Sequence, residues 1–405
     1  MQHGAIDIVC NPHTPLEVES RQVGVDEQFM DKVRMPEEMR VGVELVEYVA
    51  KMFETFTAVK GVNFTVDHGS FFVILGPSGC GKTTTLRMIA GLELPTSGRI
   101  LLDDEDVTSL PASARDIAFV FQLFALYPHM NVRQNIGFPL RCQNYPRSEI
   151  KRSVEEAAKL LRIDHLLDRR VGGLSGGDRQ RVALGRAIVR RPKAFLMDEP
   201  LGALDAEFRR LMCGELRELH DRIDATSIYI THDQLEAMAM ADRIAIMNRG
   251  RIEQIGAPQE IYDCPKTMFV ADFIGAPSMS FLDVHTSLRR GDRVIRIDGA
   301  TVDMPELFED RAEGKFALGV RPENVSFADS SALRGRVIGA EYLGTTQIVT
   351  VTTANGQVKA RLPSGKPVRV GETVGLALRA DKLSLFDAAD GHALVSALHV
   401  GGLHG

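Results

Sequence analysis

Residues Gly76–Thr83 have the types and the spacing of a loop that binds nucleotide phosphates. They read Gly-Pro-Ser-Gly-Cys-Gly-Lys-Thr and follow the apolar run Phe71–Leu75. Glycines let the backbone turn so tightly that successive N–H groups point inward, and the start of the next helix adds partial positive charge there. Lys82 is predicted to reach the β- and γ-phosphates, and the Thr83 hydroxyl to bind Mg²⁺. The alternative is a chance glycine-rich turn, which the strand before it and the helix after it argue against.

Polar residues end three further apolar runs, where open α/β sheets place their ligand sites. Asp198 suits Mg²⁺, and Glu199 beside it can accept a proton from an attacking water. Gln122 can bind Mg²⁺ and sense bound ATP, and His232 can hold the γ-phosphate and the water in line. Each of these residues alone is more often a satisfied polar group of the core or of a loop. Their joint placement at strand ends of one phosphate-loop domain favours a hydrolytic site.

The apolar pattern predicts an α/β nucleotide-binding domain from about residue 41 to 275. Val41–Val49 alternates like an edge strand. Strands alternating with helices imply a mostly parallel sheet with both faces covered. Residues 148–167 carry apolar residues at helical spacing, and an inserted helical subdomain is predicted at about 125–182. The buried strands are predicted at 71–75, 117–121, 194–197, 227–230 and 244–247.

The two ends of the chain differ from this domain. Residues 276–405 contain short strands and many glycines, and Asn355-Gly356 is a strong hairpin signal, so a separate all-β domain of barrel type is predicted. Residues 1–40 show no helical or strand period and are predicted to be an extension, disordered or preceding the true start. The candidate starts are Met30, Met35 and Met39.

The composition is that of a globular protein. With 405 residues the chain can form two or three domains. No apolar run reaches the ~18 residues of a membrane helix, and we predict no signal peptide. Five scattered cysteines lack metal-ligand or disulfide spacing, which suits a reducing cytoplasm. The net charge of −6 argues against nucleic acid as the main partner.

From about residue 41 to 275 the sequence resembles the ATP-binding subunits of ABC transporters. The family's motifs occur in its usual order: Gly76–Thr83 (Walker A), Gln122 (Q-loop), Leu174–Gly177 (signature), Asp198-Glu199 (Walker B and catalytic glutamate), Leu204-Asp205 (D-loop) and His232 (H-loop). The resemblance implies ATP and Mg²⁺ as cofactors. It implies catalytic roles for Glu199, His232 and Gln122, and metal ligation by Thr83, Gln122 and Asp198. The nucleotide-binding residues that it implies are Phe53, Gly76, Pro77, Ser78, Gly79, Cys80, Gly81, Lys82, Thr83, Thr84, Ser175, Gly176, Gly177 and Asp205.

The resemblance also implies partners. Two copies of the chain should enclose two ATP molecules head to tail, each site combining the Walker motifs of one copy with Ser175–Gly177 of the other. Two transmembrane permease chains, and indirectly a solute-binding protein, complete such an importer, and the ATPase subunits lie at the cytoplasmic face of the inner membrane. Phe53, predicted to lie in a loop, matches the residue that stacks on the base, although Glu54 replaces the usual glycine after it. The alternative for Phe53 is a residue at the edge of the core.

Three further segments resemble importer ATPases of the maltose and glycerol-3-phosphate type: Ala125–Met130, Phe273–Met279 and Gly319–Glu323. In those proteins the C-terminal part is a TOBE domain, as expected here for 276–405. This resemblance favours a sugar, a polyol or a related phosphate as the solute. The alternatives are importers of ferric iron, sulfate or polyamines, and a nucleotide-dependent regulatory module acting through the β domain. A soluble ABC ATPase of chromosomes or ribosomes is a further alternative, but its long coiled coil or duplicated cassette is missing.

Asp178 departs from the family pattern, in which glutamine ends the signature. A carboxylate near a phosphate is repulsive, yet an acid in the first turn of a helix is stabilising by about 0.3–1 kcal/mol. We therefore expect Asp178 to turn towards the helix amides and to leave Ser175–Gly177 for the phosphate. Gly172-Gly173 replaces the family's usual polar lead-in.

Overall fold

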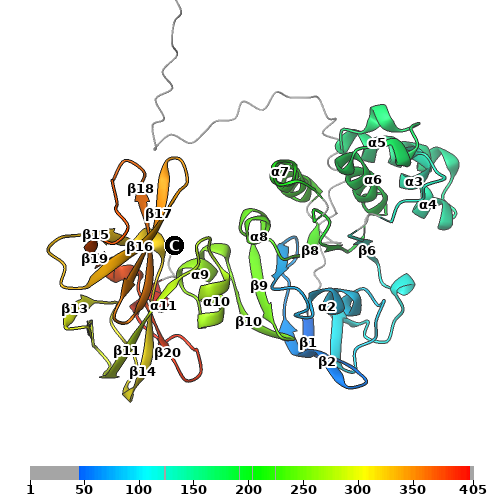
Figure 1. Ribbon diagram of the computed structural model, residues 1–405. Coiled ribbons are helices and arrows are strands. Elements are labelled where there is room, and N and C mark those ends of the chain that lie inside the picture. The colour runs from blue at the N-terminus through cyan, green and yellow to red at the C-terminus, as the bar shows by residue number, and fades with distance from the viewer. Residues whose placement is uncertain (1–44, 123–124, 191, 203, 224, 402–405) are drawn as a thin grey trace, which may run out of the picture.

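The computed structural model describes most of the chain (Figure 1). The predicted extension 1–40, with its candidate start methionines, and residues 41–44 of the predicted first strand lie outside the described residues. The described residues are 45–122, 125–190, 192–202, 204–223 and 225–401.

A six-stranded sheet of order β10-β9-β3-β8-β7-β6 forms the centre of the nucleotide-binding part. Its strands are β3 (Phe71–Leu75), β6 (Ile117–Val120), β7 (Ala194–Asp198), β8 (Thr226–Thr231), β9 (Arg243–Asn248) and β10 (Arg251–Gly256). All neighbours are parallel except β9 and β10, so the predicted mostly parallel sheet is confirmed. Strand β10, which follows β9 after the tight turn Arg249-Gly250, was not predicted from the sequence.

A second, antiparallel sheet has the order β2-β1-β4-β5. Its strands are β1 (Leu45–Phe53), β2 (Phe56–Phe64), β4 (Ser97–Leu102) and β5 (Glu105–Asp106). The prediction of an edge strand here was wrong, because β1 pairs with β2 on one side and β4 on the other. Alternation of apolar residues reports that one face of a strand is buried. It does not report how many neighbours the strand has.

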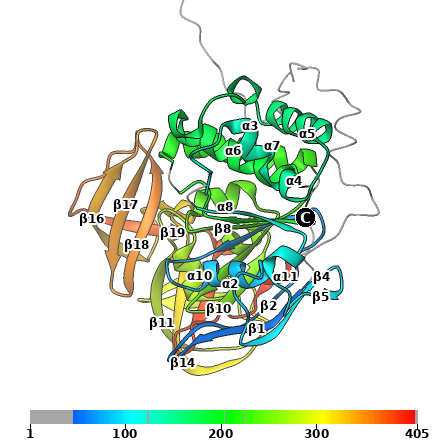
Figure 2. The same cartoon turned by 90° about the vertical axis from the view of Figure 1, so that its right-hand side faces the viewer.

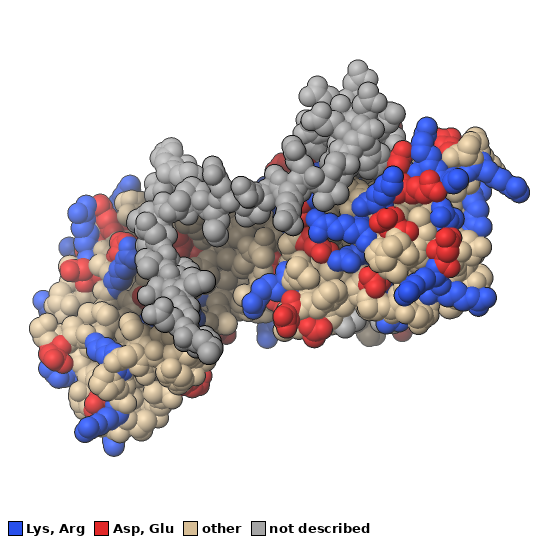
Figure 3. Space-filling model, turned by 90° about the horizontal axis from the view of Figure 1, so that it is seen from above, with Lys and Arg blue, Asp and Glu red and all other residues tan. Residues whose placement is uncertain are grey.

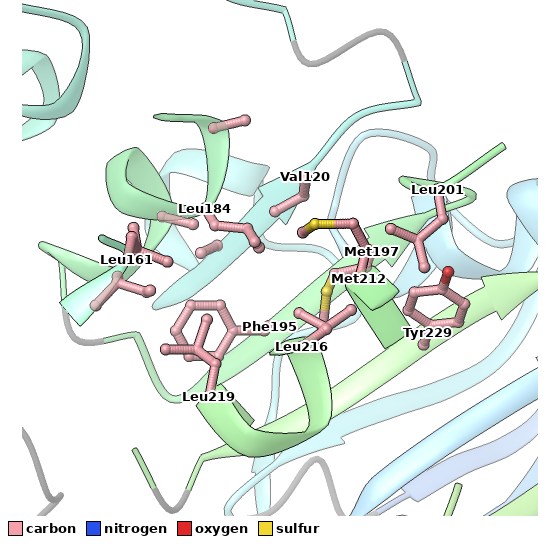
Figure 4. Close-up of a cluster of buried hydrophobic side chains, with 14 of the residues drawn as sticks. Val120, Leu161, Leu184, Phe195, Met197, Leu201, Met212, Leu216, Leu219 and Tyr229 are labelled. Atoms are coloured by element: carbon pink, nitrogen blue, oxygen red, sulfur yellow. The ribbon is translucent and has the colours of Figure 1, made fainter. Parts of the chain in front are cut away.

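Helices pack on the central sheet, and some of them gather in a group at one end of the molecule (Figures 1 and 2). The helices are α2 (Lys82–Ile89), α3 (Val132–Ile136), α4 (Phe138–Cys142), α5 (Arg147–Leu160), α6 (Gly176–Ile188), α7 (Ala206–Ile223) and α8 (Gln234–Met240). The group at one end consists of α3, α4, α5 and α6. Figure 4 shows Leu184 of α6 and Leu216 of α7 packed with Phe195 of β7 in one buried cluster. This core joins the helical group to the sheet that carries the strand-end residues.

The C-terminal part is antiparallel throughout its sheets, as the all-β prediction requires. Thr353 pairs with Gly356, so the hairpin turn is Ala354-Asn355, one residue earlier than the Asn355-Gly356 signal indicates. Its strands are β11 (Ser280–Leu288), β12 (Val294–Ile297), β13 (Ala300–Asp303), β14 (Arg311–Val320), β15 (Val325–Phe327), β16 (Arg334–Tyr342), β17 (Thr346–Thr353), β18 (Gly356–Pro363), β19 (Thr373–Leu378) and β20 (Ser384–Asp387), with α11 (Ala397–Gly401) after them.

Helices α9 (Pro258–Asp263) and α10 (Met268–Phe273) connect the two parts (Figure 1). Arg321, after β14, is buried and donates to the carbonyl oxygens of Ile274, Ala271 (3.1 Å) and Tyr262 (2.8 Å). Its guanidinium also lies 4.1 Å from the centre of the Tyr262 ring. A buried cation with several acceptors therefore fastens the β domain to the junction.

Acidic and basic side chains are interspersed over the face shown in Figure 3, most densely over the helical end. Within the described part of the chain, no helix is long and apolar enough to cross a bilayer.

Candidate active site

The phosphate loop joins the fully buried strand β3 to the start of α2. Gly79 and Gly81 have φ angles of 78° and 110°, which glycine adopts without strain. A Cβ atom on Gly76 would lie 2.2 Å from the carbonyl oxygen of Met247 in β9. The glycines thus serve both the turn and the close packing of the loop against the sheet.

Lys82 lies over this loop with only 5% of its surface exposed. Its Nζ atom donates to the carbonyl oxygens of Gly76 (2.8 Å) and Pro77 (3.1 Å). Both acceptors are neutral, and an anionic phosphate oxygen is a stronger acceptor for an ammonium group. The contacts therefore hold Lys82 in place at the loop, where a phosphate can bind it.

Thr83 and Asp198 offer two oxygen ligands of the kind that Mg²⁺ prefers. Thr83 Oγ1 donates to Asp198 Oδ1 at 3.1 Å, which links α2 to the end of β7. Burial raises the pKa of Asp198, against the opposing effect of the Thr83 hydrogen bond, and the neighbouring charge of Glu199 adds to the rise. A cation bound here would offset both the desolvation of the Asp198 carboxylate and its repulsion by Glu199.

Replacing Asp198 by asparagine is therefore expected to stabilise the nucleotide-free protein at neutral pH. Because the folded-state pKa of Asp198 is raised, its ionised form opposes folding above the ordinary pKa, and asparagine removes that cost. The same variant is expected to lose the extra stabilisation that Mg²⁺ adds to ATP. Melting temperatures with no ligand, with ATP and EDTA, and with ATP and Mg²⁺ measure both effects. A lower melting temperature without ligand would contradict the first expectation.

Glu199 is brought together with the other two residues predicted to be catalytic. Its Oε2 atom lies 3.1 Å from His232 Nδ1 and accepts from Gln122 Nε2 at 3.5 Å. The backbone of Glu199 has a φ of 43°, and its N–H donates to Ile230 in β8. This left-handed backbone conformation points the Glu199 side chain in a different direction from that of Asp198. A strained residue at a strand end is typical of active sites.

One pocket contains half of the residues predicted to bind the nucleotide. Glu199 lines it together with Ser78, Gly79, Gly81, Lys82, Thr83, Thr84, Phe53, Phe56 and Ala58. Gln122 and His232 do not line this pocket but contact Glu199, which does. Asp198 likewise contacts the lining residue Thr83. Among the described residues that line it, none belongs to the signature or the D-loop, and Gly76, Pro77 and Cys80 are also not in the lining.

Phe53 lies at the end of a strand and not in a loop as predicted. It pairs with Phe56 across a tight hairpin whose turn is Glu54-Thr55. Glu54 has a φ of 40°, which explains why glycine suits this position better. Phe56, missed by the sequence analysis, is more exposed (61%) than Phe53 (42%). The sequence signal that could have identified Phe56 is the pattern of two phenylalanines separated by two residues, which suits a tight hairpin.

Phe53→Ala is expected to weaken ATP binding by about 5- to 100-fold, the usual range for loss of one aromatic–base stack. Phe56→Ala is the matched control and is expected to change affinity much less. Isothermal titration calorimetry with ATP measures both. The chain has no tryptophan, so Phe53→Trp would also give a single indole whose emission reports stacking. An equal or larger loss for Phe56→Ala would assign the base to Phe56.

The signature segment forms the start of α6. Ser175 caps the helix by accepting from the Asp178 N–H at 3.1 Å, and its hydroxyl donates to Asp178 Oδ2 at 2.7 Å. The expectation that Asp178 turns towards the helix amides was therefore wrong. Its carboxylate lies on Ser175 and 3.7 Å from Arg181, because the Ser175 oxygen already satisfies the nearest amide. Asp205 of the D-loop likewise caps α7 by accepting from the Phe208 N–H at 2.9 Å.

Comparisons with known families and structures agree with this arrangement. The model of the ABC transporter family matches residues 59–202, and that of the TOBE domain matches residues 318–386. The chain is similar to cbiO1 of Clostridium perfringens, described as part of an ABC transporter complex, with a TM-score of 0.52 and 30% identity, covering 55% of this chain and 90% of that one.

Three curated relatives are similar over most of their length. The sulfoquinovosyl glycerol transport ATP-binding protein of Agrobacterium fabrum is 44% identical, over 84% of this chain and 95% of that protein. The sn-glycerol-3-phosphate import ATP-binding protein of Rhizobium meliloti is 47% identical, over 82% and 94%. The trehalose/maltose import ATP-binding protein of Thermococcus litoralis is 44% identical, over 87% and 99%.

Proposed function

This chain belongs to the ATP-binding proteins of the ABC transporter family, and we propose that it energises the import of a sugar, a polyol or a related phosphate. Members of this family bind ATP and hydrolyse it to ADP and phosphate. The choice of solute rests on the names of the relatives and on the resemblance of the junction Phe273–Met279. The observation that carries the catalytic assignment is the contact of Glu199 with both His232 and Gln122 at the phosphate pocket.

Hydrolysis follows from the roles of the side chains around this pocket. Lys82 and the loop N–H groups bind the phosphates, and Thr83 and Asp198 would hold Mg²⁺, with Gln122 as a further ligand. Mg²⁺, when bound, neutralises phosphate charge. Glu199 accepts a proton from the attacking water, and His232, 3.1 Å from it, orients that water against the γ-phosphate.

We propose that the active form is a head-to-tail homodimer. Ser175, Gly176 and Gly177 are absent from the lining of the phosphate pocket among the described residues. Ser175 instead sits at the start of α6, where helix N–H groups favour an anion. A second copy is therefore the source of the signature that would close each site on its γ-phosphate.

A groove between the end of β6 and helices α4 and α6 fits the proposed permease partners. Phe121, Tyr127, Phe138 and Arg186 are among the residues that line it. Phe121 is 38% exposed and follows β6 directly before Gln122. A helix of a permease on the cytoplasmic face of the membrane, seated in this groove, would thus lie beside a residue of the nucleotide site.

Purification from membranes tests this function. A tagged chain is expected to co-purify with two polytopic membrane proteins, and changes in the groove such as Phe121→Asp should release them without reducing ATP binding. A chain that purifies alone, or with ribosomes or chromosomes, would contradict the importer function. The identity of the neighbouring genes would narrow the solute further.

We also propose the division into an ATPase domain (41–275), with helical subdomain 125–182, and a regulatory β domain (276–405). One observation favours a regulatory role for the β domain. Gln234, two residues after His232, bonds to Phe273 and Gly275 of the junction, and Arg321 of the β domain binds the same segment at Ile274.

A further inference from the structure

We propose that Arg209 positions His232 and the signature segment together, and thereby couples the two ATP sites of the dimer. The inference rests on the proposed head-to-tail dimer, in which His232 and the signature of one copy serve different nucleotides. Arg209 lies in the first turn of α7, the helix that begins directly after the D-loop. It does not line the phosphate pocket, so its role is one of positioning.

The guanidinium group of Arg209 hydrogen-bonds to two segments and faces a further carboxylate without a hydrogen bond from Nε. One Nη atom donates to the carbonyl oxygen of Leu204 in the D-loop at 2.8 Å, and the other donates to Asp233 Oδ2 at 3.0 Å. The Nε atom lies 3.5 Å from Glu236 Oε1. Arginine suits this task because its planar fork presents several donors in fixed directions, whereas lysine is a single point charge.

On one side, these contacts fix both sequence neighbours of His232. Asp233 caps α8 by accepting from the Leu235 N–H at 2.8 Å, and its own N–H donates to Thr231 Oγ1 at 2.9 Å. Thr231 in turn donates to Glu236 Oε2 at 2.6 Å. The backbone is thus fixed by hydrogen bonds immediately before and immediately after His232.

Glu236 anchors this arrangement inside the protein. It is 3% exposed, and the hydroxyl of Tyr229 in β8 donates to its Oε2 atom at 2.8 Å. Tyr229 belongs to the buried cluster shown in Figure 4. Arg209 is the cation that faces this buried carboxylate and the Asp233 carboxylate, so its removal would leave two acidic groups close together.

On the other side, Leu204, which Arg209 binds, and Phe208, its neighbour in sequence, lie against the signature. Leu204, whose carbonyl Arg209 binds, would be 3.3 Å from a Cβ atom on Gly176. Phe208, the residue before Arg209, would be 2.3 Å from a Cβ atom on Gly177. A shift of the signature on binding the partner's nucleotide is therefore passed through packed atoms to Arg209, and from there to the segment of His232.

The experiment compares Arg209→Lys and Arg209→Gln with wild type in ATP titrations of hydrolysis. We expect wild type to show a Hill coefficient well above one, and both variants to approach one while the maximal rate falls about tenfold. ATP affinity of the single phosphate pocket should change less than about twofold. The matched control is Arg217→Gln, because Arg217 ties the same helix to the end of α8 through Met240 O (2.8 Å) and to Asp242 (2.9 Å), away from the D-loop.

Equal loss of cooperativity in Arg217→Gln, or unchanged cooperativity in both Arg209 variants, would overturn the inference and leave the proposed function intact. A wild type that hydrolyses ATP without forming a dimer would overturn both. Should the Arg209 variants fail to fold, Glu236→Gln replaces them: it keeps acceptors for Tyr229 and Thr231, removes the charge that faces Arg209, and should show the same loss of cooperativity.

Discussion

Glu199→Gln is expected to lower the rate of ATP hydrolysis by about 10²- to 10⁴-fold, the usual loss on removing a general base. Glutamine has the shape of glutamate and can still accept from Gln122, which lies 3.5 Å away. Its amide cannot take a proton from water at neutral pH. ATP binding should therefore persist, and the closed dimer should accumulate because hydrolysis no longer opens it. Phosphate release and light scattering with ATP measure the two effects.

Glu207→Gln is a suitable control for this substitution. Glu207 is an exposed carboxylate in the first turn of α7 and does not line the phosphate pocket. We expect it to change the hydrolysis rate little. Hydrolysis at the wild-type rate in Glu199→Gln would remove Glu199 from its proposed role and leave His232 as the next candidate for activating the water.

The phosphate loop could be predicted from sequence because its causes are local. The buried strand, the glycines with positive φ and the helix beginning at Lys82 all lie within about 20 residues, and each has its own pattern. The strand ends that carry Gln122, Glu199 and His232 were also predictable, since parallel strands place their ends on one edge of the sheet. The order β8-β7-β6 makes these strand ends neighbours, and their side chains meet at 3.1 and 3.5 Å.

What could not be predicted depends on contacts between distant segments. The alternation in β1 was correct, but the partner β4 on its second side comes from a segment some 50 residues later. Arg209 reads as one of many surface arginines of a helix, and only the packing of α7 on α8 brings Asp233 and Glu236 to it. For Asp178, the sequence favoured the helix amides, whereas the choice of the Ser175 hydroxyl depended on the geometry of the cap.

Gly177→Ala is expected to lower the hydrolysis rate by about 10- to 100-fold without weakening ATP binding to the phosphate pocket. A Cβ atom on Gly177 would lie 2.3 Å from two ring carbons of Phe208, so either the ring or the start of α6 must move. Overpacking of this kind costs about 1–3 kcal/mol, and here it would displace the segment that must meet the partner's nucleotide. Hydrolysis rate and ATP affinity, measured on the same preparation, separate closure of the dimer from binding.

A second substitution tests the physical cause. If the contact with Phe208 is responsible, the double variant Gly177→Ala/Phe208→Ala should recover at least part of the lost rate, because removal of the ring makes room for the new methyl group. Gly173→Ala, in the lead-in to the signature, is the control, since its Cβ atom would meet nothing within 4 Å. No recovery in the double variant would show that the methyl group acts elsewhere. In the proposed dimer the remaining neighbour is the partner's nucleotide, so this outcome would shift the requirement for glycine from packing within one chain to contact between two.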